Sequence, residues 1–536
     1  MIRRHPIMTQ RKDDSYPTAA VPARMEAATK GEVPLARVGK PLLAAAFVVA
    51  LVYALPLLLS WVYGSGPLYI TDYDDRFYLA RILDAYRGES LANPYLVEHE
   101  HGSTLLPELG ERCFAGAARL LHVAPLSAVS AGMIVLPVVI FLLCCLLGWR
   151  LGLPPNYAVL SGAMLLLMPS ITRVLPPYEP TQMGFLRYYG VGISPESHVA
   201  LLLAALVCIE RAWAMSGRLW VLLAAFTLGV TFYTPPYYWS FAWGGTFFLA
   251  LSGRSEQRKR LLAVAALSLG IGLPTLLRLL AGVQQTLERS DLMEPGHLPD
   301  ALTAFLGFST LALATIVWHF RKQLQAAGAF LLPFLVTGGL LFFQAIVTGR
   351  HLEEFHWAHP VVPLAYLSLA MVLHLWQGRL RFSWLVALAG VVVLAAMVTQ
   401  AEAYFRLMRA RADYPAIFAL DREIPQTLVW INAHTPADSV ILAKDPEEMA
   451  TLVVFTHDKV YWTLNLGWHV IPESEVLART ESLERWSPEH PFRLPYRADY
   501  FLGHRAECTG VPSAALLYQN SYEQTCVAMV SNLAGN

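Results

Sequence analysis

The chain has 536 residues, of which 55% are hydrophobic and 15% are charged, and 40 Lys and Arg balance 40 Asp and Glu. Soluble globular domains carry about 25% charged residues, so this composition excludes an ordinary water-soluble enzyme. No GxxxxGK loop, no GxGxxG after a strand and no basic patch is present, which argues against nucleotide or nucleic-acid partners.

Residues 1–40 hold eight Lys or Arg, four acids and no apolar run. They predict a disordered cytoplasmic tail without a cleavable signal, because the first apolar stretch begins late and is long enough to span a bilayer.

The transmembrane domain is expected over residues 41–400, with a first outer loop at 64–125. Apolar runs predict about eleven spans, near residues 41–63, 126–147, 157–169, 196–215, 219–233, 237–253, 261–281, 301–319, 326–347, 361–376 and 382–400. The third span is short, and the pair flanking residues 234–239 is also compatible with a re-entrant hairpin. The basic inner loops place the N-terminus inside, so the C-terminal region faces the periplasm or cell exterior of a multi-pass inner-membrane protein.

Three acids, Asp72, Asp74 and Asp75, follow the first span directly. Thr71 with Asp74 fits a capping box, and acids in a first turn complement the helix dipole. Carboxylates are costly at a membrane, so the cluster is either a set of helix caps or a working site. A single cap would not require three acids.

The residues after these acids predict an amphipathic helix over 75–87 that lies on the membrane and ends at Gly88. Its apolar residues recur at helical spacing, which leaves Arg76, Asp84 and Arg87 for a polar face.

Two later outer loops are also polar. Glu179, Arg187 and Tyr188 lie in the loop 170–198 and Arg350, His351 and His356 in the loop 348–363. The first fits an ordinary interface loop with Tyr and Arg at headgroup level. The cations of the second could neutralise a lipid-linked phosphate, and a metal-binding cluster is a weaker alternative.

The C-terminal region, residues 401–536, has 17 acids against 11 Lys or Arg and no spanning run. A helix, a turn, a buried strand at 440–443 and a second helix predict a small α/β domain that buries its own core outside the cell. Cys508 and Cys526 lie in this oxidising compartment and are candidates for a disulfide.

The order of these parts resembles the GT-C glycosyltransferase superfamily: a first span, an outer loop with DxDD, the helix DDRFYLARILDAYRG, an NPY segment, a later loop LRYYGVGISPES and an outer α/β domain. The helix segment is also similar in layout to one in the oligosaccharyltransferase catalytic subunit, whose WWDYG motif this chain lacks. The resemblance implies a polyprenyl-phosphate-linked sugar donor and a glycan, lipid or protein acceptor.

Under this reading Asp74 or Asp75, and next Asp72, acts as general base or orients the acceptor directly or through Mg²⁺ or Mn²⁺ held by Asp74. Arg187, Arg350, His351 and His356 would stabilise the leaving phosphate, with Glu179 and Tyr188 beside them. Two other classes stay open: a transporter or flippase of a lipid-linked or small polar substrate, and a non-catalytic assembly protein.

Overall fold

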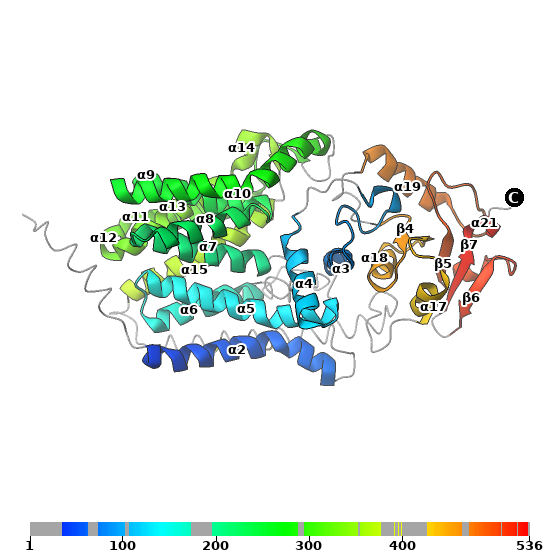
Figure 1. The fold of residues 1–536 in the computed structure, drawn as a ribbon, viewed down its shortest axis with the longest axis horizontal. Helices are drawn as coiled ribbons and strands as arrows, with labels where there is room; N and C mark the ends of the chain where they lie inside the picture. The colour runs from blue at the N-terminus through cyan, green and yellow to red at the C-terminus, as the bar shows by residue number, and fades with distance from the viewer. Residues whose placement is uncertain are drawn as a thin grey trace, which may run out of the picture. The chain divides into compact units, whose positions relative to one another are not determined.

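The computed structural model describes residues 35–62, 73–101, 107–172, 196–287, 294–351, 354–376, 426–463, 471–504, 506–521 and 524–533, with three single positions between 391 and 398. The chain divides into two units, Met1–Ala45 and Ala46–Asn536. The second unit consists mostly of helices, followed by a mixed β-sheet (Figure 1).

Helices occupy ten of the eleven stretches predicted as spans. They are α2 (Leu35–Val62), α5 (Pro125–Arg150), α6 (Pro155–Thr172), α7 (Glu196–Ala214), α8 (Arg218–Thr231), α9 (Pro236–Ser252), α10 (Ser255–Leu287), α11 (Ala301–His319), α13 (Ala326–Leu341) and α15 (Ala358–Leu375). The short helices α12 (Arg321–Leu324) and α14 (Gln344–Thr348) lie between them in the sequence. The eleventh stretch, 382–400, lies almost wholly outside the described residues.

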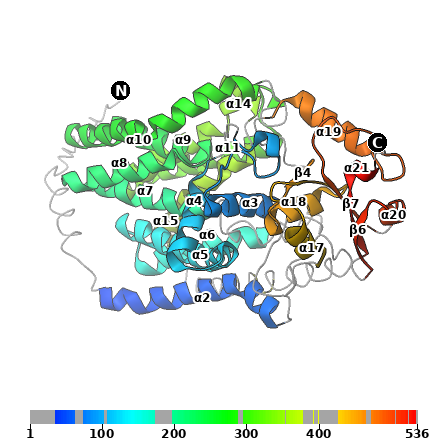
Figure 2. The same cartoon turned by 45° about the vertical axis from the view of Figure 1, so that its right-hand side comes forward.

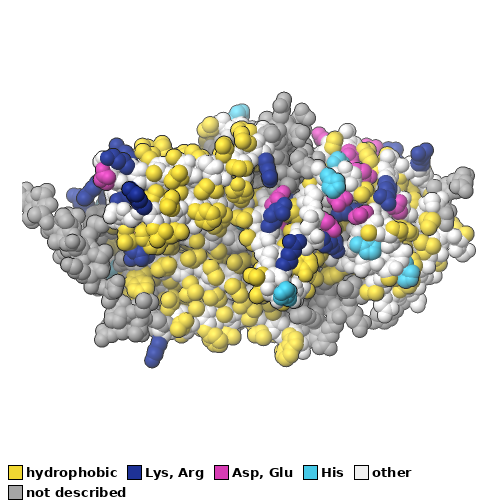
Figure 3. All heavy atoms as spheres, in the orientation of Figure 1, with side chains coloured by type: hydrophobic (Ala, Val, Ile, Leu, Met, Phe, Trp, Pro, Cys, Tyr) yellow, Lys and Arg dark blue, Asp and Glu magenta, His cyan; other side chains and the backbone are white. Residues whose placement is uncertain are grey.

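Five helices in the described part of the chain are long and apolar enough to cross a membrane. They are α5, Ser197–Ala214 of α7, Ser255–Leu280 of α10, α11 and α15. Figure 3 shows that hydrophobic side chains are abundant on the visible surface of the helical bundle, as expected where lipid is the solvent. The structure therefore has the character of a multi-pass membrane protein.

Small residues let the helices of the bundle approach one another closely. A Cβ at Gly245 of α9 would collide with the Phe334 ring of α13, and one at Gly229 of α8 would collide with Ile271 of α10. Helix association in lipid depends on such close packing, because burial from water supplies no driving force there.

The helix predicted at 75–87 is present as α3 (Tyr73–Arg87), and Gly88 ends it with φ of +89°. Its predicted polar face is wrong. Arg76, Phe77 and Ile82 are all buried, as is Asp84, because α3 packs against α4 (Leu109–Leu121), α5 and α18 (Pro446–Phe455). Of the three residues assigned to a polar face, Arg87 alone is exposed.

The C-terminal region contains a five-stranded sheet in the order β4-β3-β5-β7-β6. The strands β3 (Val440–Leu442), β4 (Lys459–Val460) and β5 (Tyr500–His504) run parallel, whereas β7 (Thr525–Met529) is antiparallel to both β5 and β6 (Leu516–Asn520). The helices α17 (Gln426–His434), α18 and α19 (Glu473–Arg485) accompany it, with the short helices α20 (Ala506–Thr509) and α21 (Val530–Leu533). The predicted strand at 440–443 and the helices on either side of it are thus confirmed.

A disulfide joins Cys508 to Cys526, with their Cα atoms 5.7 Å apart. The bond connects the segment after β5 to β7 and confirms the predicted pairing. It is consistent with an extracytoplasmic location for this region.

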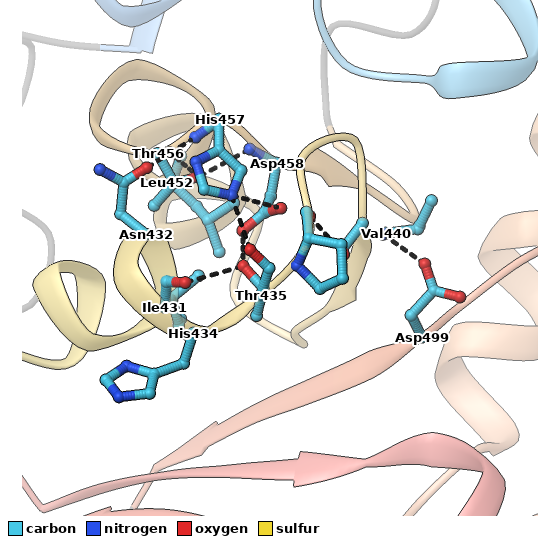
Figure 4. Close-up of polar contacts among 12 residues, drawn as sticks. Ile431, Asn432, His434, Thr435, Val440, Leu452, Thr456, His457, Asp458 and Asp499 are labelled. Carbon is cyan, nitrogen blue, oxygen red and sulfur yellow. Dashed lines mark hydrogen bonds and ion pairs between the residues drawn. The ribbon is translucent and has the colours of Figure 1, made fainter.

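A polar network ties together the amino ends of β3 and β4 (Figure 4). The Thr435 hydroxyl lies 2.7 Å from Asp458 Oδ2 and 2.7 Å from the Ile431 carbonyl, and His457 Nε2 lies 2.9 Å from the Thr435 carbonyl. The Asp458 side chain is fully buried, and burial raises its pKa to about 6. These contacts hold the segment between α17 and β3 against the residues that precede β4.

The C-terminal region does not bury its core alone, contrary to the sequence-based expectation. One hydrophobic cluster includes Phe77 and Ile82 of α3 together with Ile441 of β3, Val453 of α18 and Trp486. Figures 1 and 2 both show α3 beside α18, from two directions. The first loop and the sheet region therefore share one core.

Candidate functional site: an imidazole cluster at three helix starts

Three histidines and three aromatic residues meet where α7, α9 and α15 begin. We call this group the imidazole cluster; its members are His198, Tyr237, Tyr238, His356, Trp357 and His359. His198 lies in the first turn of α7, the two tyrosines in that of α9 and His359 in that of α15, while His356 and Trp357 belong to the 3-10 turn η3 (Glu354–Trp357).

Tyr237 is the centre of the imidazole cluster. Its ring centroid lies 5.5 Å from that of His356, with nearly parallel planes, and 6.1 Å and 6.2 Å from those of Trp357 and His359, edge to face. The His356 and His359 rings are 5.3 Å apart. These spacings fall within the favourable range for aromatic pairs.

Local sequence explains why these side chains converge. Pro235 and Pro236 start α9, because proline is accepted in the first turn where its missing N–H is not needed. That start places Tyr237 and Tyr238 in the first turn of α9. Beside the start of α9, η3 runs directly into α15, so His356 and His359 lie one turn apart.

The imidazole cluster has the character of an anion-binding region. A helix N-terminus carries a partial positive charge of roughly half an elementary charge and unpaired N–H groups. Three helices start here, and the ring N–H of an imidazole can donate a hydrogen bond. Trp357, Tyr237 and His359 are each at least nine-tenths buried, so a ligand in contact with them would be shielded from water.

The other predicted phosphate-binding residues fall in two groups. Arg350 and His351 form β2, which pairs antiparallel with β1 (Glu294–Pro295) and precedes η3. The Arg350 carbonyl accepts a hydrogen bond from Gln344 Nε2 at 3.1 Å. Glu179, Arg187 and Tyr188 lie outside the described residues.

The predicted catalytic acids lie at the start of α3. Asp74 and Asp75 are in its first turn, with side chains outside the described part, and Asp72 precedes the described helix, as does the predicted capping residue Thr71. These carboxylates are the oxygen ligands that Mg²⁺ and Mn²⁺ prefer. Among the side chains that the structure describes, no group of three or more His, Cys, Asp or Glu residues is arranged to hold a metal ion.

The rest of α3 contains two buried ionisable side chains, Arg81 and Asp84. Arg81 Nε lies 2.7 Å from Glu111 Oε1 of α4, and its guanidinium also donates to the carbonyls of Leu91 and Pro107. Asp84 is enclosed near Lys459 of β4, and burial raises the pKa of its carboxyl to about 7 despite the lysine's opposing effect. Both side chains lie within three helical turns of Asp74 and Asp75 in the sequence.

A second set of charges joins the first loop to the C-terminal region. Arg479 of α19 is fully buried, with Nη2 3.0 Å from Glu98 Oε2 and 2.8 Å from Glu475 Oε1. Its guanidinium stacks 4.1 Å from the Tyr496 ring, and His99 Nε2 lies 2.9 Å from Glu475 Oε2. The Val460 N–H of β4 donates to the Tyr95 carbonyl at 2.8 Å.

Sequence reasoning missed this junction. The Glu475–Arg479 spacing of four residues is a helical ion-pair signal, but nothing local points to Glu98, more than 370 residues earlier. No family model matches the chain. No curated protein matches it either.

Proposed function

We propose that this protein is a membrane glycosyltransferase that moves a sugar from a polyprenyl-phosphate-linked donor to an acceptor hydroxyl at the outer membrane face. The observation that supports it best is the imidazole cluster, where three helix starts, three imidazoles and three aromatic rings meet within an apolar bundle. A phosphate attached to an isoprenoid chain needs this combination of anion-binding groups beside lipid.

In the proposed reaction the acceptor oxygen attacks the anomeric carbon, and the bond from that carbon to the phosphate oxygen breaks. The electron pair of the broken bond leaves with the phosphate, whose charge the imidazoles, the helix starts and Arg350 stabilise. Asp74 or Asp75 takes the acceptor proton as general base, with Asp72 the next candidate. The aromatic rings of the cluster pack against the sugar or the first isoprene units.

The resemblance to GT-C enzymes supports the same proposal independently of the cluster. The acids follow the first apolar helix directly, and α3 continues into a core shared with the C-terminal region. Because the rest of α3 is packed in this core, its first turn is expected to be held in place, and a catalytic base needs such a fixed position.

The test is transfer in liposomes from a panel of polyprenyl-phosphate sugars, measured as release of polyprenyl phosphate. Asp74→Asn or Asp75→Asn should lower turnover at least about 100-fold, the lower end of a general base contribution, with an unchanged thermal midpoint. Asp300→Asn is the matched control. Asp300 caps α11 through the Thr303 N–H at 2.7 Å, and Asn caps almost as well.

His356→Gln adds a second readout, because it should raise KM for the donor more than it lowers kcat. If all three acids tolerate Asn with turnover within about threefold of the parent, they are helix caps and the proposal fails. Release of polyprenyl phosphate by none of the donors would likewise contradict it.

A further inference from the structure

Helix α4 exposes a row of large apolar side chains at its end. Leu120 is 80% exposed and Leu121 is 66% exposed, and Val123 follows them at 37%. Phe114 and Ala118 of α4 are buried, and Leu121, seven residues after Phe114, continues that face past its buried part. A soluble surface rarely presents adjacent leucines so fully, so this row indicates an interaction surface.

The exposed face of α4 has an apolar flank and a cationic flank. Cys113 and Leu120 are seven residues apart, close to two helical turns, and so share one flank; Arg112 and Arg119 share the other by the same spacing. Arg119 donates to the Ala85 carbonyl at 2.9 Å and lies over the Tyr86 ring at 5.7 Å. Arg119 thus contacts the end of α3, whereas Arg112 pairs with Glu108, the residue before α4, at 2.7 Å.

Helix α4 lies next to a candidate membrane span in the sequence, which brings its exposed face close to the membrane. Three residues separate it from α5, the candidate span that begins at Pro125, and His122 turns the chain between them with φ of +54°. Figure 1 shows α4 running across the direction of α5. In Figure 3, Lys and Arg side chains gather over α4 at the border of the hydrophobic surface of the bundle.

We propose that α4 is an interfacial helix that binds the lipid bilayer. Leu120, Leu121 and Val123 enter the boundary between headgroups and acyl chains. Arg119, bonded to α3, and Arg112, paired with Glu108, lie on the other flank and stay at headgroup level. An amphipathic helix with leucines on one flank and arginines on the other lies in this plane.

This assignment gives α4 the role that the sequence pattern had suggested for α3. It requires that α5 crosses the membrane, and it does not depend on the proposed glycosyl transfer.

The test is spin labelling of the whole protein in liposomes of phosphatidylcholine with phosphatidylglycerol. Nitroxides are placed by Leu120→Cys and, as a control, by Leu477→Cys, a leucine of α19 that is 55% exposed. The background carries Cys113→Ala and Cys208→Ala, since Cys144 and Cys145 are buried and Cys508 and Cys526 form the disulfide.

Relaxation by oxygen, which concentrates in lipid, is compared with relaxation by a water-soluble nickel chelate. The ratio should be at least about fivefold higher at position 120 than at 477, as expected for a side chain in the acyl boundary. Native Cys113, labelled without its substitution, should give an intermediate ratio. A ratio at 120 equal to that at 477 would overturn the proposal. Spin–spin broadening at 120 would overturn it in favour of a second copy of the chain on this face.

Discussion

At the scale of single residues, Asp84 is a buried titratable group of α3, the helix that carries the predicted catalytic acids Asp74 and Asp75. Its carboxyl is 2% exposed in the core that supports α3, and burial raises its pKa from 3.8 to about 7. The folded protein therefore keeps a proton there over a pH range in which the unfolded chain has lost it. The protonated carboxyl therefore contributes to the free energy of unfolding. This contribution is fully present below pH 3.8 and is lost as the pH rises to about 7.

The expected result is a thermal midpoint that falls between pH 5 and pH 8 in the parent protein and falls less in Asp84→Asn, which is neutral throughout. By proton linkage the difference in free energy of unfolding across the full window is on the order of 4 kcal/mol. Glu484→Gln, on the exposed face of α19, should keep the pH dependence of the parent. Identical pH profiles for the parent and Asp84→Asn would show that Asp84 is ionised in the folded state.

At the scale of elements, Arg479 connects α19 with the first loop. Removing one partner of a buried ion pair costs about 3–5 kcal/mol, because it leaves uncompensated charge. We therefore expect Arg479→Met to lower stability by about that amount and to speed proteolysis of the first loop. Arg485→Met is the matched control: Arg485 lies on the same helix but is exposed, 3.8 Å from Glu481, so its loss should cost less than about 1 kcal/mol.

Chemical denaturation in detergent measures the first effect, and mass spectrometry of tryptic peptides measures the second. Equal losses in the two variants would mean that the junction does not depend on Arg479.

The sequence correctly predicted that α3 is a helix, but it did not predict which of its side chains are buried. Helical spacing of Phe77, Leu79 and Ile82 located it, and Gly88 marked its end correctly. The pattern assigned Arg76 and Asp84 to a polar face because charged residues are usually exposed. Their burial depends on α4, α5 and α18, and the last of these lies more than 350 residues further along the chain. No local pattern carries that information.

The contacts within the imidazole cluster could not be predicted from local sequence patterns either. The composition of the loop at 348–363 identified His356, but its contact with Tyr237 follows from the packing of α9 against α15.

At the scale of the whole molecule, the remaining prediction concerns topology. The basic inner loops and the odd number of spans expected from the sequence predict that the C-terminal region lies outside the cell, and the disulfide agrees with that prediction. A reporter fused after Gln400 should therefore be active only if it functions in the periplasm or outside the cell. Peptides of the mature protein, analysed without reduction, should contain Cys508 joined to Cys526; a cytoplasmic reporter signal would reverse the proposed orientation.

The core that α3 shares with the sheet region also constrains how the protein is made. Helix α3 leaves the ribosome some 400 residues before Trp486, the largest fully buried side chain of that core. At 5–20 residues per second, the delay is about 20 to 80 seconds. Throughout it Phe77 and Ile82 lack the members of the cluster that come from the C-terminal region. The newly made first loop thus has to be protected from aggregation, by lipid or by a chaperone, until the last quarter of the chain arrives.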